Sequence, residues 1–144
     1  MMNRLLAAAG VAACALLATQ ASAQEQISLS AGFVPDPVSV EIYSGGPTDA
    51  SGIAGSCVGM VADQPDISLT FRSQGGPLGI AVYSSGDTSL VINGPDGRWY
   101  CNDDADGLNP QLRWGRAPSG QYDIWVGAVG DAAPSTVLIT EGSF

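Results

Sequence analysis

Acceptor oxygens are concentrated in one short segment, Trp99–Pro110. Asp103, Asp104, Asp106 and Asn109 all lie between residues 102 and 109. Carboxylates held this close together repel one another unless a cation lies between them. Calcium takes six to eight oxygens from carboxylates, carbonyl groups and water, and a polar loop with a glycine turn can supply them. The segment therefore predicts a calcium site on a loop.

Asp87 is a further candidate ligand, because it directly precedes an expected strand close to this loop. The loop does not continue as an EF-hand, since no Glu occupies the twelfth position and strands are expected on both sides. Zinc is disfavoured in a chain that has no His, and magnesium is less suited than calcium to an oxygen-rich protein cage. The alternative is a solvated loop whose Asp and Asn side chains cap turns.

Cys57 and Cys101 are the two cysteines outside the N-terminal segment. In an exported chain such a pair predicts a disulfide, which would close a loop of about 45 residues and add about 3–4 kcal/mol. The alternative, a catalytic thiol, needs a His base, and a serine nucleophile needs His or Lys. The chain contains neither His nor Lys, so the sequence does not predict an enzyme.

Residues 1–23 are typical of a secretory signal peptide, with a basic start at Arg4, an apolar run and a small-residue cleavage site after Ala23. Lipidation at Cys14 is the alternative. We expect a periplasmic or secreted protein with no membrane insertion after cleavage. The remaining chain has four Arg against 14 acids, a surface unsuited to nucleic acid or anionic lipid.

Gly and Pro recur about every ten residues between short runs rich in Val, Ile, Tyr and Thr. This spacing predicts an all-β fold, either a sandwich or a barrel, of about eight or nine short antiparallel strands. Residues 24–37 form a leader strand or a loose arm, and residues 38–144 form one domain. The clearest hairpin pairs residues 90–92 with residues 98–100 across Pro95-Asp96-Gly97. The expected strands are 38–43, 57–62, 67–72, 78–84, 89–93, 99–102, 111–114, 120–127 and 136–141.

The aromatic side chains offer a second kind of site. Tyr122, Ile124 and Val126 alternate along one strand, which places Trp125 on the opposite face and predicts that it is exposed. Trp114 lies between two arginines and is the next candidate for a ligand patch, because Arg stacks on aromatic rings. The alternative is that both tryptophans pack in the core.

Several motifs together resemble the bacterial pre-peptidase C-terminal domain family. They are an Asp-initiated strand with a Pro-Asp-Gly turn in 87–97, Cys-Asn-Asp-Asp at 101–104, Ser-Gly-Gln-Tyr-Asp-Ile-Trp-Val-Gly at 119–127, and Cys-Val-Gly at 57–59. The resemblance implies a jelly-roll sandwich, a Cys57–Cys101 bridge, calcium bound near Asp87, Asp103 and Asp104, and an accessory role beside a secreted enzyme. Domains of this family usually accompany a protease, and this chain carries none.

The leading hypothesis is an exported, calcium-stabilised, non-catalytic module that binds an extracytoplasmic protein or polysaccharide. One alternative is an adhesive or envelope-structural protein, which would self-associate through an exposed strand edge. The other is a small carboxylate-dependent hydrolase, which requires two acids converging in a concave pocket with at least one perturbed pKa.

Overall fold

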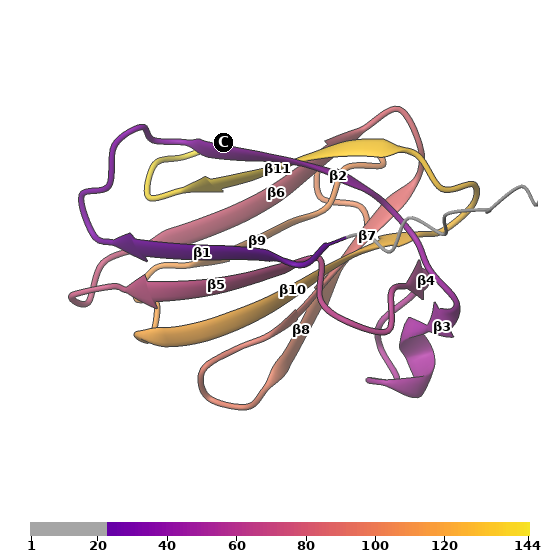
Figure 1. The fold of residues 1–144 in the computed structure, drawn as a ribbon, viewed down its shortest axis with the longest axis horizontal. Coiled ribbons are helices and arrows are strands. Elements are labelled where there is room, and N and C mark those ends of the chain that lie inside the picture. Colours follow the sequence, from indigo (N-terminus) through magenta and orange to yellow (C-terminus); the bar gives the residue numbers. More distant parts are fainter. Residues whose placement is uncertain (1–22) are drawn as a thin grey trace, which may run out of the picture.

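The computed structural model describes residues 23–144, so the predictions for residues 1–22, including Cys14, lie outside the described residues. Two β-sheets pack face to face as a sandwich (Figure 1). No helix in the described part of the chain is long and apolar enough to cross a bilayer. The elements are β1 (Glu25–Ser30), β2 (Val38–Tyr43), β3 (Thr48–Asp49), η1 (Ala50–Gly52), β4 (Met60–Val61), β5 (Ile67–Arg72), β6 (Leu78–Ser84), β7 (Thr88–Asn93), β8 (Trp99–Asn102), β9 (Gln111–Trp114), β10 (Gly120–Ala128) and β11 (Pro134–Thr140).

The larger sheet, here called sheet A, contains β1, β5, β10, β7 and β8 in that order, with β4 and β3 continuing beside the far end of β10. The smaller sheet B has the order β2-β11-β6-β9. All pairings are antiparallel except β1 with β5, which is parallel. Each predicted strand has a counterpart, and the predicted all-β sandwich is confirmed.

The strand count is eleven instead of the expected eight or nine. One addition is β1, so the segment 24–37 contains a leader strand, because Ile27 and Leu29 alternate with polar residues and pack against the core. The other is the short β3. In the predicted strand 57–62 only Met60–Val61 pairs. Cys57 lies in a loop instead.

The main core fills the space between the sheets. Ile67, Leu69 and Phe71 of β5 alternate with outward residues, and Ile80 of β6 and Ile139 of β11 face them from sheet B. The predicted hairpin forms, since β7 pairs with β8 across residues 94–98. Its register differs by two residues from the predicted pairing of 90–92 with 98–100, because Ile92 stands opposite Tyr100 and Leu90 opposite Asn102. Tyr100 is partly buried, and the other core side chains named here are fully buried, which fixes which residues face outward.

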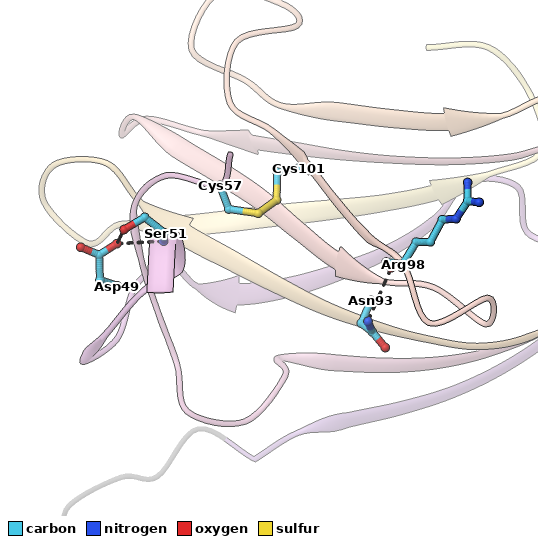
Figure 2. Close-up of a disulfide and its surroundings, with 6 residues drawn as sticks. All are labelled: Asp49, Ser51, Cys57, Asn93, Arg98 and Cys101. Atoms are coloured by element: carbon cyan, nitrogen blue, oxygen red, sulfur yellow. Dashed lines mark hydrogen bonds between the residues drawn. A yellow bond between two sulfur atoms is a disulfide. The ribbon is translucent and has the colours of Figure 1, made fainter. Parts of the chain in front are cut away.

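A second, smaller core lies on the outer face of sheet A. The segment 48–62 covers Val91 and Trp125 there, and the Cys57–Cys101 disulfide joins this segment to β8 (Figure 2). The two Cα atoms are 5.3 Å apart across 44 residues of sequence, so the predicted disulfide is confirmed. The bridge holds the segment against one half of the outer face.

Candidate functional site

Asp66 lies immediately before β5, where β10 changes its pairing partner. β10 pairs with β5 as far as Ile124, opposite Ile67, and next meets β4 only at Ala128. The backbone N–H of Val126 falls between these pairings and donates to Asp66 Oδ2 at 2.8 Å. A buried N–H without an acceptor costs about 1–3 kcal/mol, so the carboxylate side chain replaces the missing strand partner.

The backbone of Asp66 joins the start of β5 to β10 and to β1. Its N–H donates to the carbonyl of Ile124 at 2.9 Å, and its carbonyl accepts from the N–H of Glu25 at 2.8 Å. Only 8% of Asp66 is exposed. Burial raises the pKa of its carboxyl to about 6, although the hydrogen bond from Val126 acts in the opposite direction. Near neutral pH the Asp66 carboxyl group is therefore ionised, and its burial destabilises this charged form relative to the neutral one.

Asp66 lines a cleft of about 380 Å³. Two further acids line it, Glu25 of β1 and Glu41 of β2, and so does Tyr43 of β2, which is 58% exposed. The remaining lining residues are Ala23, Ile42 and Pro134.

The charge around this cleft has one sign. None of the four arginines in residues 23–144 lines it. Both carboxylate oxygens of Glu41 accept from Thr136 Oγ1, at 2.8 and 3.0 Å. Asp66 has one oxygen bound to Val126, and within residues 23–144 no hydrogen bond reaches the other. We call Glu25, Glu41, Tyr43 and Asp66 the acidic cleft. Its chemistry favours a cation with hydrogen-bond donors.

The predicted calcium ligands do not come together. Within the described residues, no three His, Cys, Asp or Glu side chains lie close enough to hold a metal ion. Asp104 and Asp106 are exposed, and Asp87 and Asp103 are half-buried. Asn109 Oδ1 accepts from the N–H of Ser84 at 3.2 Å.

The loop is instead organised by hydrogen bonds to its own side chains and backbone. Asn102 Oδ1 accepts from the N–H of Gln111 at 2.9 Å, and Asp106 and Asn109 pair through their backbones at 3.0 Å. These contacts guide the chain from β8 in sheet A to β9 in sheet B. The donor set in this arrangement does not fit a calcium ion, and calcium binding stays a prediction of the sequence.

The predicted exposure of Trp125 is wrong. Trp125 does lie on the outer face of sheet A, but the segment 48–62 covers it and leaves 8% exposed. Trp114 packs on the opposite, inner side, with its ring centroid 5.1 Å from Tyr100 and 5.3 Å from Tyr122. The two tryptophans therefore do not form one ligand patch. The exposed tryptophan is Trp99, at 39%.

The acidic cleft was missed by the sequence analysis. Its residues come from three segments distant in sequence, and single acids in a chain with 14 of them carry little signal. One signal was available, because Asp66 directly precedes the apolar strand beginning at Ile67. An acid at the start of a buried strand must either be solvated or find a hydrogen-bond donor.

Comparison with known proteins gives few relatives. No family model matches the chain. An uncharacterized protein of Synechococcus elongatus is 41% identical over 66 residues, which are 46% of this chain and 48% of that protein. The chain thus matches about half the length of this curated relative.

Two solved structures are similar in fold. The pre-peptidase C-terminal domain of a collagenase from Bacillus anthracis has a TM-score of 0.49 at 12% identity, and 82% of this chain covers 97% of that one. PliG of Aeromonas hydrophila, a periplasmic inhibitor of g-type lysozyme, has a TM-score of 0.41 at 15% identity, with 82% and 98% covered. This protein is a disulfide-bonded β-sandwich, and its function must be derived from its own residues.

Proposed function

We propose that the protein is an exported, non-catalytic binding module whose acidic cleft takes a cationic side chain of an extracytoplasmic protein. One observation carries the proposal: Asp66 is almost fully buried, yet it lines an open cleft in which every charged side chain is an acid. The Cys57–Cys101 disulfide supports export, because such bonds persist in oxidising compartments.

A guanidinium or ammonium group suits this cleft for an energetic reason. Burial removes water from the Asp66 carboxylate, and a bound cation would replace the lost solvation with a charge-assisted hydrogen bond. Tyr43 offers an exposed ring on which a guanidinium could stack. Protonation of Asp66 competes with the cation, so affinity is highest well above pH 6 and falls as the pH drops through about 6.

The residues of the cleft favour binding over covalent chemistry. The chain offers no His or Lys as a base, and the hydrogen bonds at Glu41 and Asp66 hold these carboxylates to Thr136 and Val126. Each group is thus fixed in place by the fold. Fixed acceptors lower the entropic cost of binding a matching donor.

Calorimetric titration with a tetra-arginine peptide tests the proposal. The oxidised protein should bind the peptide more tightly at about pH 8 than at about pH 5. Asp66→Asn should weaken binding by about tenfold at the higher pH. Asp104→Asn is the matched control, because it removes the same charge at an exposed position outside the cleft. Equal effects of the two variants would show nonspecific attraction to an acidic protein and reject the cleft.

A carboxylate-dependent hydrolase is the second candidate, and one observation favours it. Acids converge in a concave site, and the pKa of Asp66 is raised to about 6, as general acid catalysis requires. This candidate predicts hydrolysis of glycosidic or ester chromogenic substrates that is lost in Glu25→Gln. If the protein is a binding module, none of these substrates is hydrolysed, and the tetra-arginine peptide binds although no substrate is present.

A further inference from the structure

The part of the outer face of sheet A that segment 48–62 leaves open carries a straight row of polar side chains. The strand registers place Trp99 opposite Asn93, Asn93 opposite Asp123, Asp123 opposite Ser68, and Ser68 opposite Gln26. The row thus crosses all five strands from β8 to β1. Neighbouring strands are about 4.8 Å apart, so the row is about 19 Å long. We call these five residues the polar row.

A second row runs beside it. Gln121, Thr70 and Ser28 stand opposite one another on β10, β5 and β1, and all three are exposed. On the other side of the polar row, the covered residues Trp125 and Val91 form the edge of the smaller core. The uncovered part of the face is therefore a strip of hydroxyl, amide and carboxylate groups that borders the covered Trp125. Ser68 at its centre is only 6% exposed, so the accessible groups of the polar row are those on either side of it.

Hydrogen bonds hold the centre of the polar row in place. Ser68 Oγ donates to Asp123 Oδ1 at 2.5 Å, and Gln121 Nε2 donates to the same oxygen at 2.8 Å. Gln24 Nε2 donates to Ser68 Oγ at 2.8 Å. Within residues 23–144, no hydrogen bond reaches Asp123 Oδ2, so this oxygen can accept from a ligand.

The ends of the row differ in character. The Trp99 ring lies 5.4 Å from the ring of Trp125 at an interplanar angle of 41°, and this contact supports the ring while 39% of the residue stays exposed. Next to it, the Asn93 amide nitrogen faces the Arg98 carbonyl (Figure 2). The Asn93 oxygen lies on the other side of the amide and remains available as an acceptor.

This surface does not have the composition of a protein-binding face. Interface cores are enriched in aromatic, Met and Arg residues and depleted of Ser and Asp. The two rows contain one aromatic residue and no aliphatic one. Sugars present the complementary chemistry: hydroxyl groups that donate to carboxylates and pair with amides, and an apolar ring face that stacks on an indole.

We propose that this face binds a neutral polysaccharide, which lies across the strands along the polar row with one sugar ring stacked on Trp99. The acidic cleft is lined by other residues, so a sugar-bound module could still hold a cationic partner. A neutral chain is favoured because the protein has a formal net charge of −9, which repels anionic polymers.

Affinity gel electrophoresis tests the proposal. The oxidised protein should be retarded by at least one of hydroxyethylcellulose, laminarin, galactomannan and xylan, and not by polygalacturonate. Trp99→Ala should weaken the retardation by about tenfold, as expected for loss of an aromatic anchor. Asn93→Ala and Asp123→Asn should weaken it while leaving the Trp99 ring and its fluorescence in place.

Tyr43→Ala is the matched control, because it removes the exposed aromatic residue of the acidic cleft. It should leave polysaccharide binding unchanged and weaken binding of the tetra-arginine peptide, whereas Trp99→Ala should do the reverse. The two proposals can therefore fail separately. Retardation by none of the four neutral polymers, or retardation that survives in both Trp99→Ala and Asp123→Asn, would overturn the sugar-binding face.

Discussion

Replacing Asp66 by Asn tests the energetics of the buried carboxylate. The amide oxygen of Asn can still accept from the N–H of Val126, so the variant keeps the hydrogen bond and loses only the charge. The pKa of Asp66 is raised from 3.8 to about 6. A difference of about 2 pKa units corresponds to about 3 kcal/mol between the two protonation states.

The sign follows from proton linkage. Between the unfolded pKa and the folded pKa, the folded protein holds the Asp66 proton and the unfolded chain releases it. The contribution of this group to stability therefore rises as the pH falls from above about 6 to about 4. Asp66→Asn resembles the protonated form at every pH. It should be more stable than the parent by about 3 kcal/mol at about pH 8, and the difference should vanish near pH 4.

Chemical denaturation across this pH range measures the difference directly, and the melting temperature should rise by about 10 °C at the higher pH. Subtracting the unfolding free energy of the parent from that of the variant removes the contribution of the other acids, which the two proteins share. Asp66→Ala should instead be less stable than Asp66→Asn by about 1–3 kcal/mol at every pH, because it leaves the Val126 N–H without an acceptor. An Asn variant that is no more stable than the parent, or a difference that does not change with pH, would refute the reasoning.

Three further predictions concern the outer face and the loop. Reducing the Cys57–Cys101 disulfide should lower the unfolding free energy by about 3–4 kcal/mol in urea titrations, and a loss below about 1 kcal/mol would contradict its role. Gly127→Ala should lower it by about 1–3 kcal/mol, because a Cβ there would clash with Ser89 Oγ, whereas Gly130→Ala meets open space and should change it little. Calcium binding, as predicted from the sequence, requires a melting temperature that rises with calcium and loses this dependence in Asp103→Ala/Asp104→Ala; an unchanged melting temperature leaves the loop a polar turn.

Local patterns made the strands predictable. Pro95-Asp96-Gly97 fixed the β7–β8 hairpin, since Gly97 takes a φ of 76° and Asp96 Oδ1 accepts from the N–H of Arg98 at 3.0 Å. Alternation assigned Ile124 and Trp125 correctly to opposite faces of β10. These features depend on neighbours within a few residues, which the sequence displays directly.

Alternation could not show that the outer face was partly covered. Trp125 is buried because segment 48–62 lies over it, and this contact joins residues far apart in sequence. The predicted disulfide could have indicated that Trp125 is covered. Cys101 stands opposite Val91, which stands opposite Trp125, so a bridge from Cys101 to Cys57 must bring that segment to the face of Trp125.

The acidic cleft depends on long-range pairing in the same way. Glu25 approaches Asp66 only because β1 adds to β5 in parallel, whereas residues 24–37 were predicted as either a leader strand or a loose arm. The Asp-rich loop was predicted to bind calcium because its oxygen-bearing residues lie close together in the sequence. In the folded chain, two of its amide side chains accept backbone N–H groups, and no three acidic side chains of the described residues gather to hold a metal ion.

The central claim is that the ionised form of Asp66 receives a cation, and carboxyl carbon NMR of Asp66 tests it most directly. The titration is recorded for the free protein and for the protein saturated with tetra-arginine peptide. We expect a pKa of about 6 in the free protein and a decrease of at least about one pKa unit with peptide, because a nearby positive charge favours the carboxylate. An Asp66 titration that the peptide leaves unchanged would contradict it.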